Sequence, residues 1–119
     1  MSDEEIILTG RVVVPPRVHS AANGSTVCRF ILRVLDARPF DRESHEWPPG
    51  ARTDFTITTF GVLASQAARA VQVDNHVRVA GSRLMVRVDR EDSQPILEMT
   101  AETLDLMMPD GRRVMSGST

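Results

Sequence analysis

The alternation of apolar and polar positions predicts that the chain begins with two strands joined by a tight turn. Apolar and β-branched residues run from Ile6 to Val14, and Pro15-Pro16 ends this first strand because neither proline can donate to a strand ladder. Asn23-Gly24 then provides the dipeptide most typical of a hairpin turn. A second strand therefore follows directly, from Thr26 to Leu35.

The second strand has two faces of different character. Its even-numbered positions are apolar, and we assign these to the core: Cys28, Phe30, Leu32 and Val34. Its odd-numbered positions mix arginine with apolar side chains: Val27, Arg29, Ile31, Arg33 and Leu35. Arginine is thus expected on the face that points away from the core.

The rest of the chain predicts three more strands and one helix. Residues 36–53 contain three prolines and seven charged side chains without any period, which is typical of a long exposed loop. The expected elements after this loop are a strand at 54–60, a short covering helix at 62–71, and strands at 77–88 and 96–106.

Three strands, one helix and two further strands occur in the order of the OB-fold, an all-β architecture in which five strands form a Greek-key barrel. We therefore expect one domain over residues 5–106, with one short helix between the third and fourth strands. Residues 107–119 follow as a short flexible C-terminal tail, because no clear strand or helix pattern remains there.

Composition and charge exclude several functions. The 14 cationic residues are all arginine, so a P-loop lysine or a Schiff-base lysine is impossible. Cys28 alone cannot build a thiolate zinc site, the three histidines are dispersed, and no G-x-S-x-G nucleophile motif occurs. The chain has no membrane-length apolar run and starts with acids instead of a basic signal region, so we expect a cytoplasmic protein without membrane contact.

The net charge of −2 conceals an uneven distribution. Residues 10–90 contain 12 arginines against 7 acidic residues, whereas both ends of the chain are acidic. Salt screens distant charges over about 8 Å, so the basic middle can attract phosphate locally.

An ordered set of motifs carries a family resemblance. The set comprises I-L-T-G-R at 7–11, Pro16, Asn23-Gly24, F-I-L at 30–32, Glu46-Trp47, Asp54-Phe55 leading to T-F-G at 59–61, Leu63-Ala64 and V-R-V-A-G at 77–81. It resembles the bacterial single-stranded DNA-binding proteins over roughly residues 5 to 106. The resemblance implies an OB-fold, commonly a homotetramer, that binds single-stranded DNA without sequence preference, catalysis or cofactor, in replication, recombination or repair at the nucleoid.

Two other functions remain open at this point. An OB-fold of this kind can serve as an interaction subunit of a replication-restart or similar complex, with little affinity for DNA. Asp89, Glu91 and Asp92 also permit a metal-dependent OB-fold nuclease, although a solvated turn is the favoured interpretation of that acidic group.

The candidate DNA-binding residues combine aromatic rings, which stack on bases, with arginines, which bind phosphates or stack in turn. They are Phe55, Phe60, Arg29, Arg33, Arg38, Trp47, Arg83 and Arg87. The resemblance places stacking aromatics at Phe55 and Phe60, yet strict alternation puts these two on opposite faces of a strand. Core packing is the alternative for both phenylalanines and for Trp47, and a solvated strand face is the alternative for the arginines.

The last residues, Met115 to Thr119, lack the acidic tip with which many members of this family recruit other proteins. Either the protein is a tail-less paralogue or the chain is truncated. If the end is native, we expect the protein to coat DNA without recruiting partners by that route.

Overall fold

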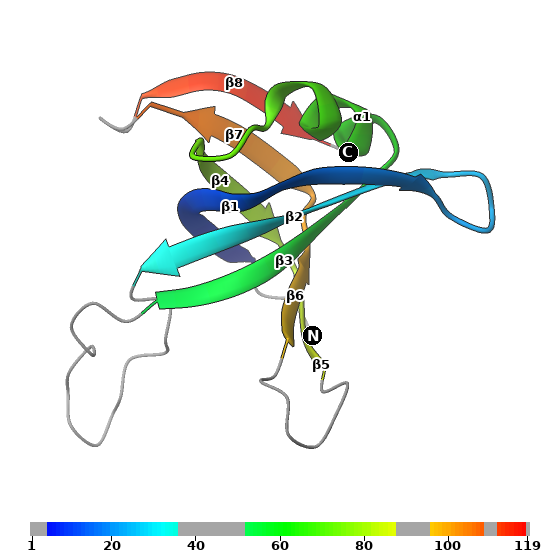
Figure 1. The fold of residues 1–119 in the computed structure, drawn as a ribbon, viewed down its shortest axis with the longest axis horizontal. Helices are drawn as coiled ribbons and strands as arrows, with labels where there is room; N and C mark the ends of the chain where they lie inside the picture. The colour runs from blue at the N-terminus through cyan, green and yellow to red at the C-terminus, as the bar shows by residue number, and fades with distance from the viewer. Residues whose placement is uncertain (1–4, 36–51, 88–95, 109–111, 119) are drawn as a thin grey trace.

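The computed structural model describes residues 5–35, 52–87, 96–108 and 112–118, and its strands form one strongly bent sheet with a helix at one end (Figure 1). The elements are β1 (Ile6–Ser20), β2 (Thr26–Leu35), β3 (Arg52–Phe60), α1 (Gly61–Ala70), β4 (His76–Gly81), β5 (Arg83–Arg87), β6 (Ile96–Thr100), β7 (Thr103–Met107) and β8 (Arg113–Ser118). The strand order in the sheet is β5-β6-β3-β2-β1-β4-β7-β8. The β3–β6 pair is parallel and the other pairs are antiparallel.

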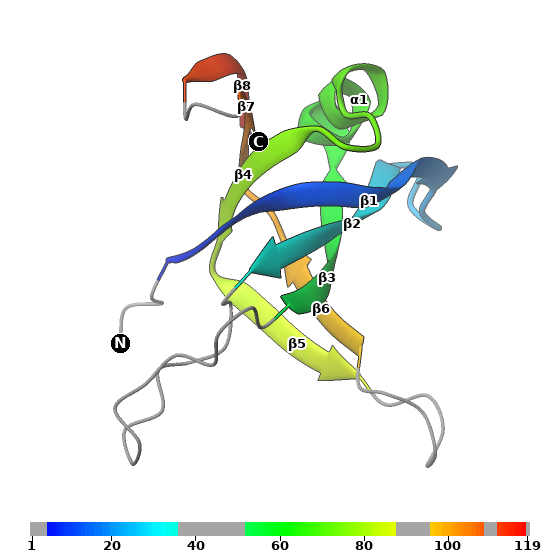
Figure 2. The same ribbon diagram turned by 60° about the vertical axis from the view of Figure 1, so that its left-hand side comes forward.

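The expected fourth and fifth strands each divide in two at a sharp corner, where β4 turns into β5 (Figure 2). A Cβ atom at Gly81 would lie only 2.1 Å from the carbonyl oxygen of Thr100, so the two backbones meet at this corner without room for a side chain. The bent hairpin pairs with β1 through β4 and with β3 through β6. The result is the barrel-like OB-fold that the sequence predicts, with its helix between β3 and β4.

Strand β1 continues beyond the prolines that were expected to end it. It pairs with β2 as far as Ser20, and its register shifts between Val12 and Val14 and again between Val14 and Arg17. Pro15 and Pro16 fall within the second shift, where no ladder pair is formed. Because β4 pairs only with residues 6–11, this part of β1 is also an edge strand, and edges and bulges are the places where a sheet tolerates proline.

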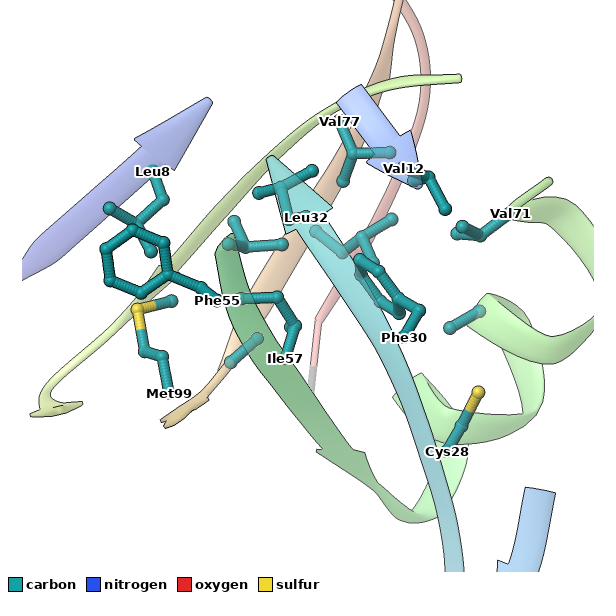
Figure 3. Close-up of a cluster of buried hydrophobic side chains, with 14 of the residues drawn as sticks. Leu8, Val12, Cys28, Phe30, Leu32, Phe55, Ile57, Val71, Val77 and Met99 are labelled. Atoms are coloured by element: carbon teal, nitrogen blue, oxygen red, sulfur yellow. The ribbon is translucent and has the colours of Figure 1, made fainter. Parts of the chain in front are cut away.

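The even-numbered side chains of β2 form the core, as expected. Cys28, Phe30, Leu32 and Val34 are all buried, and they meet Ile57 on β3 and Val77 on β4 in the cluster that Figure 3 shows. Helix α1 contributes three further buried side chains: Leu63, Ala64 and Ala67. The helix thus covers the core as its alanine-rich sequence predicts.

The turn between β1 and β2 confirms the expected hairpin. Gly24 takes a φ of +85°, which glycine adopts without strain, and its N–H donates to the Ala21 carbonyl over 2.9 Å. The Ser25 N–H donates to Oδ1 of Asn23 over 3.0 Å. The Asn-Gly dipeptide therefore does what its composition indicates: it reverses the chain and sets β2 against β1.

Residues 113–118 differ from the expected flexible tail, because they form strand β8 against β7. Met115 packs against the core, and the Cα of Gly117 comes so close to α1 that a Cβ would lie 2.5 Å from Gln66 Oε1. This strand covers an edge of β7 that would otherwise be open. Its polar sequence carried no strand pattern, so only the tertiary contacts reveal it.

Among the described residues, no helix is long and apolar enough to cross a membrane. The long loop expected over residues 36–53 lies almost entirely outside the described residues; only its last two residues are described, and these already belong to β3.

Candidate nucleic-acid interface

Arginine gathers on the outer face of β1 and β2, the face turned away from the core. Arg11 lies directly opposite Arg33, and Arg17 lies directly opposite Arg29. Like charges on opposed residues of neighbouring strands disfavour the folded state. The two arginine pairs therefore lower the stability of the sheet. Residues that lower stability without a compensating contact are expected at functional sites, so this face is a candidate site.

The two bulges of β1 keep its polar side chains on this outer face. Each shift inserts one residue, so the first moves Val14 to the outer face opposite Ile31, and the second restores the original alternation before Arg17. Arg17 and His19 therefore emerge on the same side of the sheet as Arg11. Without the second bulge they would point toward the interior.

The strand register extends this arginine surface across the sheet. Arg29 pairs with Thr58 on β3, Thr58 pairs with Thr100 on β6, and Thr100 pairs with Arg83 on β5. Neighbouring strands lie about 4.8 Å apart, so this row from Arg17 on β1 to Arg83 on β5 is about 19 Å long. We call it the arginine row: Arg17, Arg29, Thr58, Thr100 and Arg83.

A hollow of about 440 Å³ opens on the same face beside the bulged part of β1. Its lining joins apolar and cationic side chains: Val14, Pro15, Arg17, His19, Arg29, Phe30, Ile31 and Thr56. An apolar floor with guanidinium groups at its side suits a ligand that is flat and apolar in one part and anionic in another.

Phe60 provides an accessible aromatic ring at the edge of this surface. Its side chain is 42% exposed, and it lies opposite Val27, which in turn lies opposite His19. Gly61 follows with a φ of +63°, which lets the chain leave β3 for α1 immediately after the ring. Phe60 is thus accessible, and its stacking on a base stays a prediction from the family resemblance.

Phe55 contradicts the role expected for it. It is only 4% exposed and lies on the core face of β3, between Leu8 and Met99 (Figure 3). Phe55 and Phe60 are five residues apart in one strand, so when Phe60 faces outward Phe55 must face the core. Phe55 therefore packs the interior and offers no platform to a base.

The outer-face arginines differ in how far their charge is balanced. Arg33 forms a two-pronged ion pair with Asp54, at 2.9 Å and 3.1 Å, and this contact raises the pKa of Arg33 above its usual value. Arg11 forms a longer ion pair with Asp74 at 3.5 Å. Within the described part of the chain, no carboxylate pairs with Arg17 or Arg29, so these two keep the unbalanced charge of the surface.

The other half of the outer face, over β4, β7 and β8, is more nearly neutral. Arg78 binds Asp105 at 2.8 Å, and Arg113 donates to Ser116 Oγ over 3.1 Å. Burial acts to raise the pKa of Asp105, but the hydrogen bonds from Arg78 and Ser116 and the two arginine charges outweigh it and hold this pKa below its usual value. Among the described residues, β1 and β2 therefore carry more unbalanced positive charge on the outer face than β4, β7 and β8 do.

The structure adds two residues that the sequence analysis did not select, Arg17 and His19. They were missed because the prolines were expected to end the strand before them. Arg83 lies in the arginine row, and its contact with phosphate stays a prediction. The side chain of Arg87 and the whole of Arg38 and Trp47 lie outside what the structure describes. No group of three His, Cys, Asp or Glu residues that could hold a metal ion occurs among the described residues.

Comparison with known proteins gives a consistent family. The Single-strand binding protein family matches residues 3–107. Single-stranded DNA-binding protein 1 of Streptomyces coelicolor is 37% identical over 94 residues, which are 79% of this chain and 58% of that protein. Single-stranded DNA-binding protein 2 of Tropheryma whipplei is 32% identical over 111 residues, which are 93% of this chain and 73% of that protein.

Two solved structures of single-stranded DNA-binding proteins have a fold similar to that of this chain. The crystal structure of a small single-stranded DNA-binding protein from Streptomyces coelicolor aligns with a TM-score of 0.70 at 32% identity, over 93% of this chain and 98% of that one. The SSB domain of a Synechococcus protein aligns with a TM-score of 0.60 over 85% of this chain and 92% of that one, and at 19% identity it supports the fold alone.

Proposed function

The chain belongs to the single-strand binding protein family, and on that premise we propose that it binds single-stranded DNA without sequence preference across the outer face of β1, β2 and β3. The arginine row would carry the strand onward to β5. The observation that supports this proposal best is the directly opposed pair Arg17 and Arg29, which lies beside an apolar hollow and has no carboxylate partner among the described residues.

The proposed binding uses two kinds of contact. A base stacks on Phe60 or lies over the apolar floor of the hollow, which suits any base because every base has a π face. Arg17, Arg29 and Arg83 bind phosphates, releasing the counterions that surround free DNA. Neither contact reads a base edge, so the binding is independent of sequence.

The wider role is a proposal of the same kind. We propose that the protein coats single-stranded DNA during replication, recombination or repair, that it binds without catalysis or a cofactor, and that it works as a homodimer or homotetramer in the cytoplasm at the nucleoid. Arg38, Trp47 and Arg87 stay predicted contacts.

The test is a fluorescence anisotropy titration of labelled oligo-dT with the wild-type chain at 50 and 200 mM salt. Each phosphate contact on a single strand contributes about 0.7 to the slope of log affinity against log salt. Arg29→Ala should weaken binding and reduce this slope by about 0.7. The control is Arg69→Ala, which removes the same charge from the exposed surface of α1 and should leave both quantities unchanged.

Failure of the wild-type chain to bind oligo-dT even at 50 mM salt would refute the proposal. In that case the alternative gains support, in which the OB-fold is an interaction subunit with little DNA affinity. Native mass spectrometry of the same samples measures the oligomeric state, and a monomer would contradict the proposed assembly.

A further inference from the structure

The Arg29 side chain is held by two neighbours on the outer face. Its Nε donates to Thr58 Oγ1 over 3.3 Å, and its Nη1 lies 2.8 Å from Nε2 of His19. Arginine has hydrogen-bond donors only, so His19 Nε2 must be the acceptor of this bond. The imidazole in this arrangement is therefore neutral and carries its proton on Nδ1.

These two bonds orient the guanidinium plane and leave most of its donors unused. The single N–H of Nε and one N–H of Nη1 form these two bonds, and the Nη2 group of Arg29 has no hydrogen-bond partner among the described residues. Both Arg29 and His19 line the open hollow of about 440 Å³. The unused donors are thus available to a group that enters the hollow.

We propose that His19 is a positioning residue that holds the Arg29 guanidinium ready for a phosphate or base of the bound strand. This inference rests on the proposed function. An unrestrained arginine side chain loses rotamer freedom when it binds, and a side chain ordered in advance loses less, which strengthens binding without a new contact to the ligand. The planar guanidinium gains most from this because both a two-pronged phosphate bond and stacking depend on its orientation.

The second bulge of β1 is what brings His19 to this position. It sets Arg17 opposite Arg29 and His19 opposite Val27, so His19 becomes the diagonal neighbour of Arg29 on the same face. Diagonal neighbours on paired strands lie within reach of long side chains. Pro15 and Pro16 therefore serve the interface indirectly, through the register shift in which they lie.

The experiment is a double-mutant cycle on the full chain, with anisotropy of labelled oligo-dT at 50 and 200 mM salt as the readout. His19→Ala should weaken binding about threefold to tenfold. Its salt slope should stay that of the wild type, because a neutral ring contributes no phosphate charge contact. In an Arg29→Ala background the same substitution should have no further effect, since the group that it positions is gone.

Two further variants separate positioning from other roles of the ring. His19→Gln keeps a side-chain oxygen that can accept from Arg29 and should restore most of the affinity. His76 lies on β4, directly opposite Arg11 of β1 and on the same face of the sheet. His76→Ala removes this imidazole and should bind oligo-dT like the wild type. Because His19 is exposed, circular dichroism should show all His19 variants folded.

The results distinguish this inference from the proposed function. If the wild type binds and the effects of His19→Ala and Arg29→Ala are additive, His19 contacts the DNA by itself and the positioning role is refuted. Wild-type affinity in His19→Ala would refute it as well. Absence of binding by the wild-type chain would instead overturn the proposed function, and the inference with it.

Discussion

Asp54 limits the positive charge of the outer face, and its removal should strengthen DNA binding. The carboxylate holds Arg33 in a two-pronged ion pair, at 2.9 Å and 3.1 Å, in a place where both side chains are partly exposed. Arg33 lies directly opposite Arg11, at the side of the arginine row. Asp54→Asn removes the competing charge and releases Arg33 for a phosphate.

The size of the effect follows from counterion release. One added phosphate contact should steepen the salt slope by about 0.7, so the affinity ratio between 50 and 200 mM salt should grow by about 2.6-fold. At 50 mM salt we expect binding of oligo-dT to be roughly twofold to fivefold tighter than in the wild type, since exposed charge contacts are individually weak. The melting temperature of Asp54→Asn should be only a few degrees lower than that of the wild type, because an exposed ion pair contributes little to stability.

The assay is the anisotropy titration at both salt concentrations, with Glu5→Gln as the matched control. Glu5 is exposed just before β1, so this substitution changes the net charge equally without touching Arg33. Equal gains in affinity in both variants would show that net charge alone is responsible. Unchanged or weaker binding in Asp54→Asn would refute the reasoning that Arg33 is a phosphate contact held back by its ion pair.

Three further predictions concern the Phe60 ring, the corner of the sheet at Gly81 and the partly buried ion pair of Arg78 with Asp105. Phe60→Ala should weaken oligo-dT binding roughly 5- to 150-fold with an unchanged salt slope, because it removes stacking and no charge. Gly81→Ala should lower the free energy of unfolding in urea by about 3 kcal/mol or more, since its Cβ would meet Thr100 oxygen at 2.1 Å. Asp105→Asn should lower stability at pH 7 and flatten the acid limb of the stability profile, measured by thermal unfolding from pH 7 to pH 2.

The sign of the Asp105 effect follows from its lowered pKa. A carboxylate whose pKa is lower in the folded state than in the unfolded state stabilises the fold at every pH above its usual pKa of 3.8. That contribution is lost as the pH falls from 3.8 through the lower pKa of the folded state. Parallel acid limbs in wild type and Asp105→Asn would contradict the lowered pKa.

The Phe60 prediction has its own refuting outcome. A shallower salt slope in Phe60→Ala would indicate that phosphate contacts were lost together with the ring.

A second glycine provides the control for the corner of the sheet. At Gly117 the nearest obstacle to a Cβ is the end of the flexible Gln66 side chain, which can move aside, whereas at Gly81 it is backbone. Gly117→Ala should therefore cost clearly less stability than Gly81→Ala. Equal losses in the two variants would show that the close backbone approach at Gly81 is not the cause.

Local patterns in the sequence determined much of the fold. The alternation in β2 separated its buried residues from Arg29 and Arg33, Asn23-Gly24 predicted the hairpin, and the alanine-rich stretch predicted the helix. These features depend on neighbours along the chain, where period and turn chemistry act directly. The motif order was sufficient to identify the family.

Only the tertiary structure decided which aromatic side chain faces outward and which arginines share a surface. Alternation showed that Phe55 and Phe60 lie on opposite faces of β3, but which face is inside depends on the strands and the helix that cover it. The register of β6 and β5 brings Arg83 into one row with Arg29, and the bulges of β1 add Arg17 and His19. Strand pairing joins residues distant in sequence, so no local pattern could predict this surface.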